Sequence, residues 1–323
     1  LDFGLLEGSV MSTQDSTVTQ QQMQMRIRRA ERRRHLMRQS VPYLLLLPAG
    51  IMLVIFLIYP MINTIILSFW RYPLLNPDQQ AFVGFENFAR LFRSDTFWAS
   101  LDFTLRFTFV AIVLEFIIGI AGALLLDQVK LWRPLFTSIV ILPYMVAPVA
   151  AGLIWRLIWS HDFGLANFAL TTVGVDRVVW LGEPQPAFWS VVISEVWRTT
   201  PFVMLILLAG LTSIPHELIE SARIDGASPR QVFTRIILPL LAPAITVSLV
   251  FQTIFKLRVF DLVFTLTGGG PGRATTPIGL MIQRTYFRFF EGGEASAIAV
   301  ILLILGAVVS LIYLKLIYRE VEY

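Results

Sequence analysis

The chain has 323 residues, of which 56% are hydrophobic and 15% charged, with a formal net charge of +4 and a mean hydropathy of +0.69. Soluble globular domains are much less apolar, so this composition excludes a protein solvated by water alone. There is no cysteine, and the three histidines are scattered, so the sequence excludes disulfides and thiolate metal sites, and we expect no bound metal.

The first 41 residues are polar and then basic. Residues 1–25 are rich in Gln, Thr and Ser and contain no apolar segment of the signal-peptide type, so we expect a disordered cytoplasmic lead. Seven arginines follow between positions 26 and 38, directly before the first apolar segment. By the positive-inside tendency this run places the N-terminus in the cytoplasm, where it contacts anionic lipid rather than nucleic acid.

Six apolar segments are long enough to cross a bilayer, which takes about 20 helical residues. They are residues 42–70, 103–126, 135–159, 188–212, 239–266 and 296–318. We therefore predict an all-α membrane protein with a transmembrane domain over residues 42–318 and a short cytoplasmic tail over 319–323. The loops on the N-terminal side are short and basic, and six spans return the C-terminus to the cytoplasm.

The cytoplasmic stretch 215–239, between the fourth and fifth spans, carries the signals of two short helices. Pro215 suits a first helical turn, and Leu218, Ile219 and Ala222 recur at helical spacing. On the other face of this first helix, Glu220 and Arg223 are spaced to form an ion pair.

The turn between these two helices is also marked in the sequence. Gly226 stands where a left-handed residue is favoured at a helix C-terminus, and Ser228 with Gln231 forms a predicted capping box. Pro229 suits the first position of the second helix. The apolar stripe of that helix consists of Val232, Phe233, Ile236 and Ile237. Pro239 then ends the helix or bends it into the fifth span.

Six positions of this stretch match, in type and spacing, the EAA loop, written E-A-A, three residues, G, nine residues, I-x-L-P. They are Glu220, Ala222, Gly226, Ile236, Leu238 and Pro239, and Ser221 is a small-for-small departure. The chain thus resembles the transmembrane permease subunits of binding-protein-dependent ABC importers, which have the type I permease fold. The resemblance implies that the loop is a coupling helix seated in a groove of a separate ATPase. The implied coupling residues also include Glu217, Asp225, Ala227 and Phe233.

The sequence itself contains no nucleotide-binding motif. Its glycine-rich run, residues 268–272, is followed by Arg-Ala instead of the Lys and hydroxyl residue of a phosphate-binding loop. We therefore expect a transport subunit, not an enzyme, that binds no cofactor, with ATP and Mg²⁺ held by a partner ATPase dimer.

Further segments resemble the carbohydrate branch of these permeases, and the resemblance runs from about residue 42 to about residue 318. They are residues 82–88, 142–148, 164–167, 201–211 and 260–271. The run 266–271 resembles the MalF-type member of a heterodimer, which implies a MalG-like partner, an extracytoplasmic solute-binding protein and the bacterial cytoplasmic membrane. The implied solute is a disaccharide or oligosaccharide, with glycerol phosphate or another small polar solute as the alternative. The glycine-rich run itself is a plain outer turn or a lip that meets the binding protein.

Ionisable residues within hydrocarbon are costly, so those inside the predicted spans are functional candidates. They are Glu115, Glu195, Arg198, Lys256, Arg258 and Asp261. We predict a substrate path formed by these residues except Arg258, together with Trp197, an aromatic surface on which a sugar can stack. Three alternatives stay open at this point. Glu195 and Arg198 can be a purely structural pair, Arg258 can snorkel to an interface, and Glu115 can face a partner subunit.

Two other classes of function compete with the importer for this sequence. A proton-coupled carrier could use Glu115, Glu195 and Asp261 as a relay, but such carriers usually show internal repeats, and none is evident in this sequence. A membrane-bound enzyme needs a nucleophile with its base, a metal cluster or a carboxylate pair, and none stands out at a useful spacing.

Overall fold

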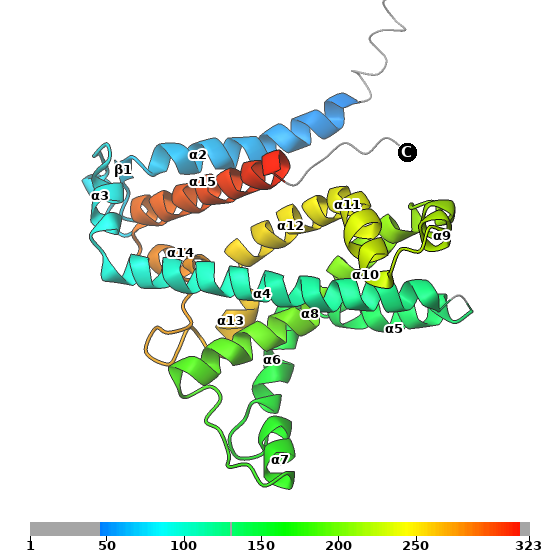
Figure 1. The fold of residues 1–323 in the computed structure, drawn as a ribbon. Coiled ribbons are helices and arrows are strands. Elements are labelled where there is room, and N and C mark those ends of the chain that lie inside the picture. The colour runs from blue at the N-terminus through cyan, green and yellow to red at the C-terminus, as the bar shows by residue number, and fades with distance from the viewer. Residues whose placement is uncertain (1–45, 130, 317–323) are drawn as a thin grey trace, which may run out of the picture. The chain divides into compact units, whose positions relative to one another are not determined.

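The computed structural model describes residues 46–129 and 131–316, and these residues are mostly helical (Figure 1). The chain divides into two units, Leu1–Asn63 and Thr64–Tyr323. The described part of the first unit belongs to one apolar helix, Leu46–Leu67, which includes the π-helix Val54–Ile58 and continues as α2, Tyr59–Leu67. The predicted first span is confirmed over these residues. The predicted tails, 1–41 and 319–323, lie outside the described residues.

A small hairpin follows the first span. Its strands, β1 (Trp70–Arg71) and β2 (Ala81–Phe82), pair antiparallel around the short helix Pro77–Gln79, and α3 (Glu86–Phe92) follows. The amide of Asn87 is buried and donates to the carbonyls of Ser68 and Trp70, at 2.8 and 2.9 Å. This side chain therefore fixes the end of the first span against α3.

Two long helices form the centre of the second unit. They are α4, Asp95–Gln128, and α8, Pro184–Thr212, and they confirm the predicted second and fourth spans. Glycines let the two helices approach closely, since a Cβ on Gly119 would lie 2.9 Å from Val203 Cγ1. The bundle is completed by α12, Ala242–Leu257, and by α15, Gly292–Leu316, which confirms the sixth span over its described residues.

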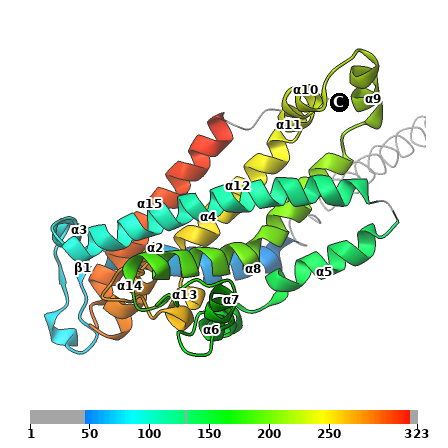
Figure 2. The same cartoon turned by 60° about the horizontal axis from the view of Figure 1, so that its bottom comes forward.

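The third predicted span is not one helix. It consists of α5, Arg133–Met145, and α6, Pro148–Ile158, bent by 90° relative to each other. The prediction of a continuous span is wrong because Pro148 disfavours the helical conformation at Ala147, and Val146 and Ala147 are both extended in ψ. As a result α6 and the following α7, Leu165–Thr172, turn away from α4 and α8 (Figures 1 and 2).

The fifth predicted span is also interrupted. The stretch 215–239 forms α9, His216–Ile224, and α10, Pro229–Val232, followed by the π-helix Phe233–Ile237 and α11, Leu238–Leu240. The segment Pro229–Leu240 meets α12 at 64°. Beyond α12, residues 258–260 leave helical geometry, and two short helices not predicted as separate elements follow: α13, Asp261–Leu266, and α14, Ile278–Phe287. Phe260, with φ −144° and ψ −63°, cannot continue the helix, so the prediction of a single span is wrong here too.

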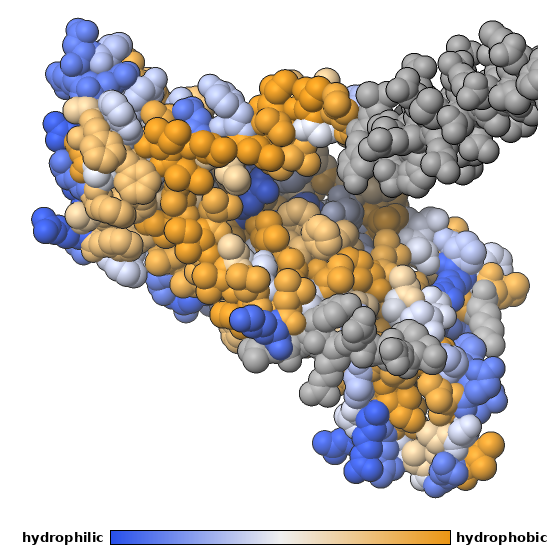
Figure 3. Space-filling model, turned by 90° about the horizontal axis from the view of Figure 1, so that it is seen from above, coloured by the Kyte–Doolittle hydropathy of each residue, from blue (hydrophilic) through white to orange (hydrophobic). Residues whose placement is uncertain are grey.

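The surface of the second unit fits a lipid environment. On α4, the side chains of Phe109, Ile117 and Leu125 recur every eight residues and are 71%, 61% and 64% exposed. Hydrophilic side chains gather instead at the end that carries β1 and α3 (Figure 3). The described residues contain four helices that could each cross a membrane, or up to six spans if each bent pair counts as one. The end with α9 lies opposite the end with α3 (Figures 1 and 2).

Candidate functional site

The loop 215–239 folds as the two-helix unit that its sequence predicts. Gly226 has φ +81°, and its N–H donates to the Arg223 carbonyl at 3.1 Å, while the Ala227 N–H donates to the Ala222 carbonyl at 2.9 Å. This is a Schellman end, which satisfies two carbonyls of α9. The predicted capping box is confirmed, because the Ser228 N–H donates to Gln231 Oε1 at 2.8 Å and the Gln231 N–H donates to Ser228 Oγ at 3.4 Å.

The loop is anchored to the membrane bundle by its apolar residues. Ile219 and Ile237 pack on a buried cluster shared by α4 and α8 that includes Leu126 and Leu207. Pro215 caps α9 rather than lying within its first turn. The expected Glu220–Arg223 ion pair does not form in the described structure, where both side chains are exposed. The loop is therefore held by hydrophobic packing and by its turn, not by surface charge.

The opposite face of the loop is open. Ile224 is 86% exposed and Leu218 is 46% exposed, although both are apolar. The residue after Ile224 in the chain begins the lining of a hollow of about 270 Å³, which is formed by Asp225, Gly226, Ala227, Gln231, Arg235 and Ile236. Of the other predicted coupling residues, Glu217, Glu220, Leu238 and Pro239 are exposed, and Ala222 and Phe233 are half-buried. Exposed apolar side chains and a hollow on one loop form a surface suited to a protein partner.

A buried network of polar and charged side chains joins three helices of the bundle. The Lys256 ammonium, on α12, lies 2.8 Å from Glu115 Oε1 on α4 and 3.3 Å from Glu195 Oε1 on α8. It also donates to Thr199 Oγ1 at 2.9 Å and to Gln252 Oε1 at 3.3 Å. The Thr199 hydroxyl donates to Glu115 and to the Glu195 carbonyl. Each of these side chains is almost or wholly inaccessible to solvent.

Glu195 is shared between the network and Arg198. The guanidinium of Arg198 binds the carboxylate of Glu195 in a bidentate manner, with Nε at 3.1 Å and Nη2 at 2.8 Å. Together with Lys256 and Glu115, the two residues carry two positive and two negative charges, so the buried group is formally neutral. Arg198 is 14% exposed at its side chain, whereas Glu115 and Lys256 are at 0%. Only the Arg198 end of the network therefore reaches the surface of the chain.

The structure thus brings together four of the six predicted path residues and separates two. Glu115 points into the network, where its Oε1 lies 2.8 Å from the Lys256 ammonium. Trp197 is 38% exposed and meets Trp155 edge to face, with ring centroids 5.6 Å apart. Asp261 is exposed at the start of α13, beyond the break in the fifth span, and does not join the network. Arg258 is exposed at the end of α12 and does not join the network.

Several residues of this region were not singled out from the sequence. Thr199 and Gln252 complete the network, and the i, i+4 spacing of Gln252 and Lys256 in an apolar helix was the available signal. An aromatic group near Arg198, in which Phe202 meets the rings of Tyr144, Phe251 and Phe255, links α5, α8 and α12. Arg156, a charged residue inside the predicted third span, was also overlooked.

The glycine-rich run forms an ordered turn. Gly268, Gly269 and Gly272 have positive φ, and the Thr276 hydroxyl donates to the Gly269 carbonyl at 2.9 Å. Arg284 of α14 donates a hydrogen bond to the Gly268 carbonyl. Burial lowers the pKa of Arg284 from its usual value, and the nearby Arg288 and Arg273 lower it further. The turn is therefore held in one shape by side chains of its own and of α14.

These features match a known family of membrane components. Residues 115–323 match the family described as the binding-protein-dependent transport system inner membrane component. The chain belongs to this family. Membership confirms the predicted class, a multi-pass permease subunit of an ABC importer, which is a transport component and not an enzyme. The region that matches includes both the loop 215–239 and the buried network.

Relatives of this permease and solved structures agree with the assignment. The chain is 41% identical to the trehalose/maltose transport system permease protein MalF of Thermococcus litoralis, over 84% of this chain and 92% of that protein. It is 35% identical to the trehalose transport system permease protein SugA of Mycobacterium tuberculosis, over 90% of both. A bacterial ABC transporter involved in the import of the acidic polysaccharide alginate matches with a TM-score of 0.77 at 28% identity, over 90% of this chain and 99% of that chain. The type I importer permease fold is confirmed by this likeness.

Proposed function

We propose that this permease passes a sugar of the disaccharide or oligosaccharide class into the cytoplasm. The proposal is supported by relatives whose names refer to trehalose and maltose, and by the polar and aromatic side chains that line the centre of this bundle. The proposed complex contains a second, MalG-like permease, a pair of ATPase subunits with ATP and Mg²⁺, and a solute-binding protein. We place it in the cytoplasmic membrane, with both termini and the loop 215–239 inside.

The proposal rests mainly on the structure of the two-helix loop at one end of the bundle. Its inner face is fixed by Ile219 and Ile237, and its outer face presents Ile224 and Leu218. We propose that this outer face docks on the ATPase as a coupling helix, with the hollow of the loop receiving a side chain of that partner. The proposed coupling residues are the ten predicted from the sequence, with Ile224 added.

The same loop leads directly into the buried network. Pro239 lies in α11, which joins α12 after a bend of 64°, and α12 carries Gln252 and Lys256. A displacement of the loop therefore acts on a helix that is tied to α4 and α8 by ion pairs. We propose that ATPase closure shifts α12 in this way, provided the docked loop binds the two ATPase states with different free energies.

The sugar path, in our proposal, runs past the exposed end of the network. Arg198 is held at one edge by Glu195, which leaves Nη1 free to donate to sugar hydroxyls, while Trp197 offers a stacking face. In this proposal Glu115 and Lys256 do not contact the sugar but hold Glu195 in position. Because the network is formally neutral, it favours a neutral sugar over glycerol phosphate, the alternative solute. Asp261 keeps a proposed place near the outer end of the path.

Transport by a reconstituted system tests the proposed function. Vesicles that contain both permeases and the ATPase should accumulate a radiolabelled α-linked disaccharide only when the solute-binding protein is outside and ATP is inside. A proton gradient should neither replace ATP nor change the rate. Uptake by this chain alone, or uptake driven by the proton gradient, would show that the proposal is wrong.

The turn at Gly226 offers a local test of coupling. A Cβ at Gly226 would meet no atom within 4 Å, so a substitution there acts through backbone strain and not through a clash. Gly226→Val should destabilise the left-handed turn by about 1–2 kcal/mol and lower sugar uptake per ATP hydrolysed in the reconstituted complex. Gly226→Asn is the matched control, because Asn tolerates the left-handed region, and it should retain most of the coupling. Equal coupling in the two variants would remove the role given to the turn.

A further inference from the structure

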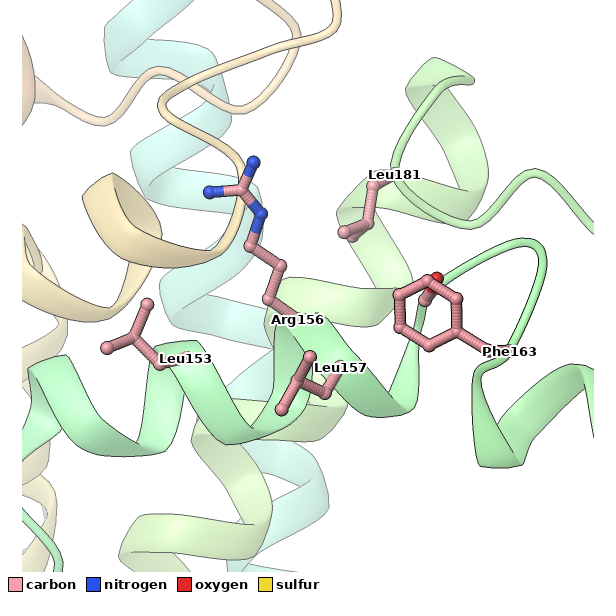
Figure 4. A pocket seen from close by; sticks show the side chains of 6 residues that line it. Leu153, Arg156, Leu157, Phe163 and Leu181 are labelled. Atoms are coloured by element: carbon pink, nitrogen blue, oxygen red, sulfur yellow. The ribbon is translucent and has the colours of Figure 1, made fainter.

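A pocket on α6 and its neighbouring loops is not explained by coupling or by the sugar path. It has a volume of about 380 Å³ and is lined by Leu153, Arg156, Leu157, Ser160, Phe163 and Leu181 (Figure 4). Leu157 is 62% exposed and Phe163 is 74% exposed. The lining is thus a largely apolar surface around one guanidinium group.

Arg156 is a cation without a counter-ion in the described structure. It lies in the last turn of α6, is exposed, and forms no ion pair or hydrogen bond with any described residue. The partial negative charge at the C-terminus of α6 favours a cation there, but it does not use the donors of the guanidinium. Five N–H groups are therefore available to an external acceptor that carries negative charge.

The sequence around this arginine changes from apolar to polar. On one side of it, Trp155 stacks on the buried Trp159, with ring centroids 5.3 Å apart, as part of the hydrophobic core. Immediately after α6 the sequence becomes polar at Ser160-His-Asp, whereas before it the chain is apolar for many residues. Arg156 thus lies where apolar and polar surfaces meet.

We propose that this pocket binds one anionic phospholipid, whose phosphodiester, unlike that of zwitterionic phosphatidylcholine, has no ammonium group of its own, with the phosphodiester on Arg156 and an acyl chain along Leu153, Leu157 and Phe163. Arginine pairs with phosphate oxygens in a bidentate geometry, and leucine and phenylalanine side chains match hydrocarbon. A sugar fits less well, because its many hydroxyls would meet only two polar side chains, Arg156 and Ser160, in this lining. The bound lipid lies along the C-terminal part of α6 and the residues that follow it, Ser160 and Phe163.

Lipid binding to the complete importer tests the proposal. The complex is placed in phosphatidylcholine nanodiscs, and fluorescent phosphatidylglycerol is titrated in and detected by energy transfer from tryptophan. We expect saturable binding that Arg156→Gln weakens about tenfold, the loss of one charge-assisted contact. Arg177→Gln, which removes an exposed arginine of the same outer segment, should leave binding unchanged. Millimolar inorganic phosphate should not displace the lipid, since the acyl chain contributes most of the contact.

A second variant keeps the test valid if Arg156→Gln does not assemble. Leu153→Glu places a carboxylate three residues before Arg156 on the same helix, where it can pair with the guanidinium and repel a phosphate. It should also weaken lipid binding about tenfold. Equal binding by wild type and both variants would overturn the proposal, and so would displacement by inorganic phosphate alone. Cross-links from position 157 to the second permease, with no retained phospholipid, would identify the pocket as a subunit contact instead.

Discussion

Lys256→Met should remove most of the folded protein from the membrane. The substitution leaves Glu115 and Glu195 buried beside each other with Arg198 as their remaining cation, and Glu115 has no contact with that cation. Removing one partner of a buried ion pair typically costs about 3–5 kcal/mol, because the other charge stays desolvated and unpaired. The expected result is a low yield of monodisperse complex after detergent extraction, and a lower temperature of aggregation for what remains.

A compensating substitution should restore the fold. In the double variant Glu115→Gln with Lys256→Met, one negative and one positive charge are removed together, and the neutral Glu195–Arg198 pair remains. The amide that Glu115→Gln introduces keeps an acceptor for the Thr199 hydroxyl, while the hydrogen bonds that Lys256 donates to Glu195, Thr199 and Gln252 are lost together with its charge. Replacing a buried pair as a whole is often close to neutral in stability. We expect the double variant to be extracted in near wild-type yield.

The double variant also tests whether Lys256 and Glu115 affect sugar transport or only the stability of the protein. If Lys256 and Glu115 only hold Glu195 in place, the recovered protein should transport sugar with a raised KM, because Arg198 is less firmly oriented. A double variant that folds well and has unchanged transport would show that the network serves stability alone. A double variant as unstable as Lys256→Met would contradict the charge-pair argument itself.

The sequence predicted continuous segments better than it predicted bends. The span 188–212 was placed within four residues of α8, Pro184–Thr212, whereas α4 starts at Asp95, eight residues before its predicted span of 103–126. The third span was drawn straight through Pro148, although a proline disfavours the helical conformation at the residue before it. Hydropathy does not distinguish a straight span from a bent one, because both bury the same apolar side chains.

The two parts of the site differed in how far local sequence could define them. The turn at Gly226 and the capping box at Ser228 depend on residues a few positions apart, and both were predicted in detail. The network depends on contacts between Glu115, Glu195 and Lys256, which are up to 141 positions apart in the chain. An ionisable side chain in the bilayer core is energetically costly, and this marked each of the three residues as a candidate. Only the packing of α4, α8 and α12 shows that they pair with one another.

Ile224→Asp should abolish coupled transport without harming the fold. The side chain is 86% exposed and belongs to no buried cluster of the described residues, so its replacement costs the isolated chain little. In the proposed complex the same position is pressed against an apolar groove, where an unpaired carboxylate would be desolvated at a cost of several kcal/mol. We expect normal insertion, loss of the ATPase during purification, and sugar uptake at background.

The matched control for that variant is Thr212→Asp, which places a carboxylate at an exposed residue at the end of α8, before the loop begins. It should retain both the ATPase and sugar uptake, because it lies outside the proposed docking face. Retention of the ATPase by Ile224→Asp would show that the exposed face of α9 is not the contact. Loss of the ATPase in both variants would mean that any added negative charge on this side disrupts assembly. These two outcomes differ in what they say about coupling. In the proposed mechanism, movement of the ATPase reaches α12 and Lys256 only if the ATPase contacts α9 and the turn after it.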